Sequence, residues 1–272
     1  MDMHIQVPNV ASDISAVSVK GLTAAYDNAP VLDNVSFELA PGQWHAVIGP
    51  NGSGKTTLLN ILAGSLMPVH GTIRLFGEDP ERRRQQSQVA YMPQHESLEW
   101  DFPVSVWDTV MTGRYGHIRR DSLARRFLPA RLSRRHHRDV CERALREVKM
   151  DHLSRRPIGQ LSGGQKKRVL LARMLVQEAP LVLLDEPLVG LDKESRRLIL
   201  DVLLRQRQLG QTIVMVTHDL VNTLKYADQV LLINRTLFGI GPPDEMLKDD
   251  MLSRTAAANW LDQARAPAEA EV

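Results

Sequence analysis

The chain of 272 residues contains a single cysteine, Cys141, and no long run of apolar residues. One cysteine excludes an internal disulfide, which agrees with a reducing compartment. No uninterrupted apolar stretch approaches the ~18 to 20 residues that a membrane-spanning helix needs. The first residues also lack the basic and apolar regions of a secretory signal. We therefore expect the chain to be made in the cytosol and to stay there.

Aromatic residues are also scarce, at 5% of the chain. Only Tyr115 and Phe127 lie within the most basic stretch, residues 114–138, which carries nine arginines and one acid, Asp121. Two aromatics are too few for a platform on which nucleic-acid bases stack, so we expect no nucleic-acid partner. The stretch is then either a solvated face of a helical insertion, which we favour, or a contact with an anionic membrane surface or another protein.

The chain does have enough apolar residues, 43%, to bury a full core. Residues 17–26 and 31–39 have the pattern of two strands joined by a turn. Residues 44–50 read as a short apolar strand that leads into a glycine loop, and residues 181–185 and 212–218 read as fully apolar strands of the kind buried in a parallel sheet. We expect an α/β fold with helical patterns at about 95–160, an N-terminal extension at 1–16, and a C-terminal helix with a disordered tail at 251–272.

The strongest motif is GPNGSGKT, which fits the phosphate-binding pattern GxxxxGK[ST] between an expected strand and an expected helix. Its glycines let backbone N–H groups surround phosphates, Lys55 adds a positive charge at the β and γ positions, and the Thr56 hydroxyl can ligate magnesium. Thr57 is expected to touch the α-phosphate. The nucleotide-binding residues predicted here are Gly49, Pro50, Asn51, Gly52, Ser53, Gly54, Lys55, Thr56 and Thr57.

Two acids, Asp185 and Glu186, follow the apolar run of residues 181–184. A carboxylate at the end of a buried parallel strand emerges beside such a phosphate loop, so Asp185 is a candidate ligand of hydrated magnesium. Glu186 is placed to orient or polarise the attacking water, which makes it the candidate catalytic carboxylate. The alternative is a capping pair of acids ahead of Pro187.

A second glycine-rich motif, LSGGQ, opens a long expected helix. It contains no acid, base or metal ligand, but a helix N-terminus with a serine cap and two glycines is a good binding site for an anion. The phosphate loop already binds one nucleotide. The question is therefore which nucleotide's phosphate this second motif binds. Its predicted phosphate-binding residues are Ser162, Gly163, Gly164 and Gln165.

In this order, the phosphate loop, LSGGQ and LVLLDEP resemble the ATP-binding cassette family, and the resemblance covers residues 17–247. It implies a P-loop NTPase core with a mainly parallel sheet, an N-terminal antiparallel β subdomain and an inserted helical subdomain. The implied ATPase domain spans residues 17–250, with the helical insertion at about 95–160. The implied cofactors are ATP and Mg²⁺.

The resemblance extends to single residues. Tyr26 matches the aromatic that stacks on adenine, and Gln94 in YMPQ matches a catalytic glutamine that also contacts magnesium. Asp192 in GLD matches a loop that faces the other subunit, and His218 in VTHD matches a switch histidine that contacts the γ-phosphate. Taken alone, Tyr26 fits a plain hairpin tyrosine, Gln94 a polar loop residue and His218 a strand-end histidine. The chain departs from the family at Val189, where a small hydroxyl residue often precedes GLD.

The family also suggests an answer for LSGGQ. Its members pack head to tail as ATP-dependent dimers, so LSGGQ of one subunit would cover the γ-phosphate held by the other. A single phosphate loop and a short insertion disfavour the duplicated translation type and the coiled-coil repair type, and no NKxD motif indicates a guanine-nucleotide switch. We expect a lone ATPase subunit, peripheral on the cytoplasmic face of the cell membrane, that acts with integral-membrane permease subunits.

The cargo is indicated only indirectly. Residues 100–117 and 241–247 look like the matching segments of importers for manganese, iron or zinc. We expect ATP-driven import of a divalent metal ion, manganese first, delivered by a metal-binding substrate protein. The alternatives are another cargo, such as an iron chelate, or a non-transport protein gated by ATP. A direct metal site at His95, Glu96, Glu99 and Asp101 is disfavoured, since ordinary loop polarity explains these residues.

Overall fold

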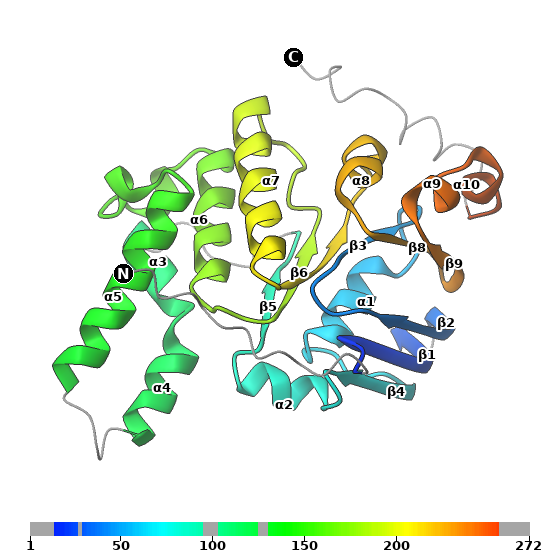
Figure 1. Cartoon of the computed structure of the whole chain (residues 1–272), viewed down its shortest axis with the longest axis horizontal. Coiled ribbons are helices and arrows are strands. Elements are labelled where there is room, and N and C mark those ends of the chain that lie inside the picture. The colour runs from blue at the N-terminus through cyan, green and yellow to red at the C-terminus, as the bar shows by residue number, and fades with distance from the viewer. Residues whose placement is uncertain (1–13, 27–28, 95–102, 125–129, 256–272) are drawn as a thin grey trace.

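The computed structural model describes residues 14–26, 29–94, 103–124 and 130–255. The strands gather on one side of the molecule in Figure 1, and helices α3, α4 and α5 lie on the other. The expected tail beyond residue 255 and the disfavoured metal site at residues 95–101 lie outside the described residues. The expected domain boundaries stay predictions.

The smaller sheet has three antiparallel strands in the order β2-β1-β4. Strand β1 is Val17–Tyr26, β2 is Ala29–Leu39 and β4 is His70–Leu75. Val17 pairs with Leu39, and Tyr26 pairs with Ala29. The predicted pair of strands joined by a turn is therefore present, and β2 begins two residues earlier than expected.

The larger sheet has six strands in the order β5-β6-β7-β3-β8-β9, all parallel except the last. The strands are β5 (Val89–Met92), β6 (Leu181–Asp185), β7 (Thr212–Val216), β3 (Trp44–Ile48), β8 (Gln229–Asn234) and β9 (Thr236–Gly241). Every residue of β3, β6 and β7 is buried, as expected for apolar strands covered on both faces. The predicted mainly parallel sheet is confirmed.

Helices and the second sheet cover the two faces of the larger sheet. Alternate strand residues point to opposite faces, so Val182 and Leu184 pack with helices α6 and α7, while Leu181 and Leu183 pack with helix α1 and the smaller sheet. The helices are α1 (Lys55–Leu62), α2 (Pro80–Gln85), α3 (Val106–Thr112), α4 (Tyr115–Ala124), α5 (Ala130–Glu147), α6 (Gly163–Leu175), α7 (Lys193–Gln208), α8 (Leu220–Tyr226), α9 (Pro243–Met246) and α10 (Asp249–Thr255).

Arg114, at the junction of α3 and α4, is buried, so the expectation of a solvated face is wrong for this residue. Its Nη1 donates to the Val176 carbonyl and to Glu178 Oε2, each at 2.6 Å, and its Nε donates to His137 Nδ1 at 3.2 Å. A buried guanidinium must be hydrogen-bonded, and here its partners lie on α5 and after α6. Arg114 therefore ties the inserted helices to the sheet-covering helix α6.

Replacing Arg114 by methionine is expected to lower the free energy of unfolding by about 2 kcal/mol, because the Val176 carbonyl and the His137 ring nitrogen lose their charged donor. Urea unfolding followed by circular dichroism measures the change. The matched control is Arg120→Met, since Arg120 is an exposed arginine of helix α4, which begins directly after Arg114. Equal midpoints for the two variants would show that the buried contacts of Arg114 do not stabilise the fold.

Candidate nucleotide site

The glycine loop lies between the end of β3 and the start of α1, as the motif predicts. Gly54 has φ 95°, a left-handed value that favours glycine. A Cβ atom at Gly49 would lie 1.9 Å from the carbonyl oxygen of Ile233, so no larger residue fits without moving the backbone. The Ser53 carbonyl accepts from the Arg235 N–H at 3.0 Å, which holds the loop against the end of β8.

The start of α1 suits an anion. Its N-cap is Gly54, which has no side chain to cap the first N–H groups, whereas the side chains of Ser162 and Asp192 cap α6 and α7. A Cβ atom at Gly52 would meet nothing within 4 Å, and Thr56 in the first turn is exposed. The residues present therefore fit the phosphates of a nucleotide.

Lys55 is a buried cation within this loop. Its Nζ donates to the carbonyls of Gly49 at 2.9 Å and Pro50 at 2.8 Å. Burial lowers the pKa of Lys55, while the negative charges of Glu186 and Asp185 oppose that shift. The ammonium is therefore held at the loop, where it interacts with the charges of the two acids at the end of β6.

Three predicted residues from the ends of β5, β6 and β7 meet in one cluster. Gln94 Nε2 donates to Glu186 Oε2 at 2.8 Å, and His218 Nε2 lies 2.6 Å from Glu186 Oε1. The hydrogen bond from His218 lowers the pKa of Glu186, burial opposes it, and the charges of Lys55 and Lys167 add to the lowering. Glu186 is therefore an ionised carboxylate at neutral pH.

The backbone at Glu186 is unusual, with φ 48° in the left-handed region. Such a conformation costs roughly 1 to 3 kcal/mol in a residue other than glycine, and it persists only where neighbouring contacts impose it. The preceding Asp185 is buried at the end of β6. The capping alternative for this acid pair does not fit, because the residue that caps α7 is Asp192.

LSGGQ forms the start of α6, and Ser162 is its N-cap. Ser162 Oγ accepts from the Gln165 N–H at 3.3 Å, and Gln165 Oε1 accepts from the Ser162 N–H at 3.0 Å. Ser162 and Gly163 are exposed, and a Cβ atom at Gly163 would meet nothing within 4 Å. The motif therefore presents a capped, open helix start at the surface.

Asp192 and Tyr26 are two further predicted site residues, each with its own surroundings. Asp192 Oδ1 accepts from the Ser195 N–H at 2.7 Å, so within its own chain this carboxylate caps α7. Its implied contact with another subunit stays a prediction. Tyr26 ends β1 with 47% of its surface exposed, which leaves its ring accessible to a base.

Sequence reasoning missed Lys167, whose side chain contacts the loop after Glu186. Lys167 Nζ donates to the carbonyls of Val189 at 2.5 Å and Glu186 at 3.5 Å. Helical periodicity could have found it, because Lys167 lies four residues after Gly163 and three after Gly164, on the same face of α6. The side chain of Val189 is itself exposed, so the departure from the family at this position buries no extra bulk.

A glycine loop between a buried parallel strand and a helix, with an acid pair at the end of another strand of the same sheet, defines the class of P-loop NTPases. Residues 32–189 match the family model described as ABC transporter. The chain belongs to this family, and it is an ATP-binding subunit that hydrolyses ATP.

Known proteins similar to this chain cover almost all of it. The manganese transport system ATP-binding protein MntB of Halalkalibacterium halodurans is 39% identical over 89% of this chain and 92% of its own length. The zinc transport system ATP-binding protein TroB of Treponema pallidum is 38% identical over 90% of this chain and 88% of its own length. A solved ATP-binding subunit of an ABC transporter shares the fold, with a TM-score of 0.73 and 24% identity over 92% of this chain and 98% of that one.

Helices α1 to α10 all lie within the residues that the structure describes. None of them is both long enough and apolar enough to cross a bilayer.

Proposed function

We propose that this chain energises the import of a divalent metal ion, manganese first and zinc or iron next, through a separate permease. The observation that carries the proposal is the likeness, over about nine-tenths of both chains, to ATP-binding proteins named for manganese and zinc transport. The cargo is bound by a substrate protein outside the membrane and never touches this subunit.

In this proposal the loop residues 49–57 hold the ATP phosphates and Tyr26 stacks on adenine. Asp185, Thr56 and Gln94 would hold Mg²⁺, since carboxylate, hydroxyl and amide oxygens are the hard donors that this ion takes. Magnesium, when bound, neutralises phosphate charge. The fit rests on the buried carboxylate of Asp185, the exposed Thr56 and the contact between α1 and β6.

Glu186 carries the chemical step by orienting and polarising the attacking water as an ionised carboxylate. His218 holds Glu186 Oε1 and Gln94 holds Glu186 Oε2, so both oxygens have fixed directions. The backbone of Glu186 is left-handed at this point, with φ 48°. His218 is the residue that we expect to contact the γ-phosphate when the site closes.

Two copies of the chain would pair head to tail, so that LSGGQ of one copy covers the γ-phosphate in the other. The open start of α6 supports this arrangement, because Gly163 has room for an approaching phosphate. Closing the pair excludes water from both sites and favours the closed state through contacts made only there.

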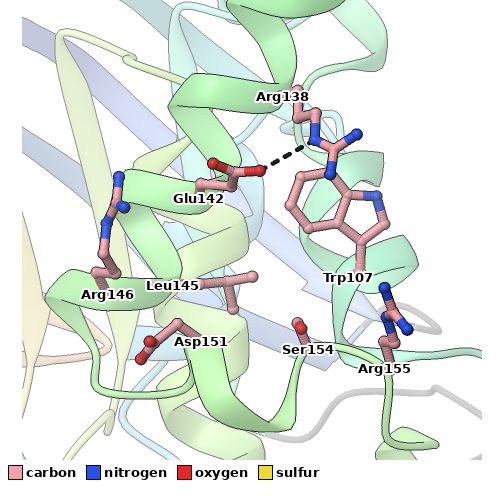
Figure 2. A pocket seen from close by; sticks show the side chains of 8 residues that line it. All are labelled: Trp107, Arg138, Glu142, Leu145, Arg146, Asp151, Ser154 and Arg155. Carbon is pink, nitrogen blue, oxygen red and sulfur yellow. Dashed lines mark hydrogen bonds and ion pairs between the residues drawn. The ribbon is translucent and has the colours of Figure 1, made fainter.

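The permease contact is assigned to the inserted helices, which line a pocket of about 460 Å³. Figure 2 shows the side chains around this pocket. The pocket lies among α3, α5 and the turn that follows α5. Within it the Arg138 guanidinium stacks over the Trp107 ring at 5.9 Å, and Arg138 Nε donates to Glu142 Oε1 at 3.0 Å. Its lining residues are Trp107, Arg138, Glu142, Leu145, Arg146, Asp151, Ser154 and Arg155. This contact would hold the chain at the cytoplasmic face of the membrane as a peripheral subunit.

Uptake of radioactive manganese is expected to fall in cells that lack this subunit, with zinc and iron uptake affected less. A plasmid carrying the wild-type chain should restore uptake, and one carrying Glu186→Gln should not. The experiment needs cells shown to lack redundant importers, with chelated iron as a further arm. Unchanged uptake of all three metal ions would contradict the metal proposal, and loss of chelated iron alone would assign the other cargo.

A further inference from the structure

The loop that follows β6 reverses direction immediately after Glu186. The Glu186 N–H donates to the Val216 carbonyl at 3.1 Å, and the Val189 N–H donates to the Glu186 carbonyl at 3.4 Å. These bonds are compatible with several side-chain directions, but the left-handed φ of 48° at Glu186 is disfavoured for this residue type. Some further contact must hold the loop in this shape.

Lys167 makes that contact from helix α6. Its half-buried side chain reaches over the turn, and its Nζ lies 2.5 Å from the Val189 carbonyl and 3.5 Å from the Glu186 carbonyl. One ammonium therefore joins the first and last residues of the turn, with the carbonyl of each residue as an acceptor. The shape of the turn sets the direction in which the Glu186 side chain leaves the backbone.

The next residue along α6 ties down the other end of the same segment. Arg168 Nη2 donates to Ser195 Oγ at 2.7 Å, and Ser195 Oγ donates to Asp192 Oδ2 at 2.8 Å. Two consecutive basic residues thus fasten the segment from Glu186 to Ser195 onto the second turn of α6. That helix begins with LSGGQ, so the loop and the helix start form one connected unit.

We propose that Lys167 is a positioning residue for Glu186, and that it makes the placement of this carboxylate depend on the position of helix α6. The inference rests on the proposed function, which gives Glu186 its role and places LSGGQ at the partner's nucleotide. In a head-to-tail pair, α6 of one chain begins at one ATP while Glu186 of the same chain lies at the other. Lys167 then links the filling of one site to the geometry of the second.

Lys167→Met removes the ammonium and keeps a long unbranched side chain, so it tests the link with little change in packing. Its kcat for ATP is expected to fall about 10- to 100-fold, the size of loss that a small misplacement of a reacting group produces, with KM for ATP unchanged. The Hill coefficient for ATP should fall toward one. Lys167→Arg should restore most of the turnover, because a guanidinium can donate to the same two carbonyls. Lys166→Met is the matched control and should keep wild-type kcat.

A second comparison separates positioning from general support of the fold. In a Glu186→Gln background, Lys167→Met should cause no further loss of residual turnover, because the group that it positions is already gone. Three results would each overturn the inference. The first is wild-type kcat in Lys167→Met, and the second is a failure of Lys167→Arg to restore kcat. The third is an added loss of turnover in the double variant together with a lower urea midpoint. If Glu186→Gln itself keeps its turnover, the proposed role of Glu186 fails instead.

Discussion

Glu186→Gln is expected to lower ATP turnover about 10³-fold and to leave ATP binding intact. The amide has nearly the shape of the carboxylate, so Gln94 and His218 keep a neighbour at the same place. It lacks the negative charge that polarises water, and a well-placed general base contributes roughly 10² to 10⁴ in rate. Binding is retained because the phosphate loop and Lys55 are unchanged.

Phosphate release measures the turnover of this variant, and equilibrium dialysis with labelled ATP measures its affinity. Size-exclusion chromatography with ATP should show a larger dimer fraction than for the wild type, since ATP that is not hydrolysed keeps the pair closed. Glu245→Gln, on α9, is the matched control. Turnover close to the wild-type value in Glu186→Gln would remove Glu186 from the catalytic step.

The phosphate loop and the buried strands could be predicted from the sequence because their causes are local. Gly49 and Gly54 are needed where a close approach and a left-handed backbone leave no room for a side chain. Strands β3, β6 and β7 are apolar at nearly every position because they are covered on both faces. In such segments a few neighbouring residues are enough to predict the local structure.

The remaining features depend on contacts between distant segments. Arg114 lies in an arginine-rich stretch and looks like a surface residue, yet Val176 and Glu178, more than sixty residues further along the chain, bury and bond it. Lys167 likewise gains its role from carbonyls 19 and 22 residues further along the chain, and periodicity within α6 places its side chain on the LSGGQ face but does not show this contact. Strand β4 is mostly polar and β5 is only 4 residues long, so neither stands out from the segments around it.

The second large effect is expected from two inactive variants that regain function when mixed. Lys55→Ala removes the ammonium from the phosphate loop, and Ser162→Arg removes the cap of α6 and places bulk at the open helix start. Loss of one preorganised donor typically lowers a rate by ~10² to 10³. Each homodimer should therefore be nearly inactive, with Ser253→Arg, at an exposed position of α10, as the matched control for added bulk.

In a mixed dimer the two defects fall into one site if each site is built from two chains. The intact phosphate loop of the Ser162→Arg chain then meets the intact LSGGQ of the Lys55→Ala chain, so the second site has no defect. If each site is built within one chain, every site in the mixture stays defective. Because two coupled sites can both be needed for turnover, nucleotide trapping is a more direct readout than the ATPase rate.

The decisive measurement is therefore γ-phosphate-dependent trapping of labelled nucleotide as a function of the mixing ratio, with mixed dimers confirmed by pull-down of differently tagged chains. A site shared between two chains predicts trapping that is absent from either variant alone and greatest near equal amounts of the two. Confirmed mixed dimers that trap no nucleotide at any ratio would contradict the assignment of LSGGQ to the partner's ATP.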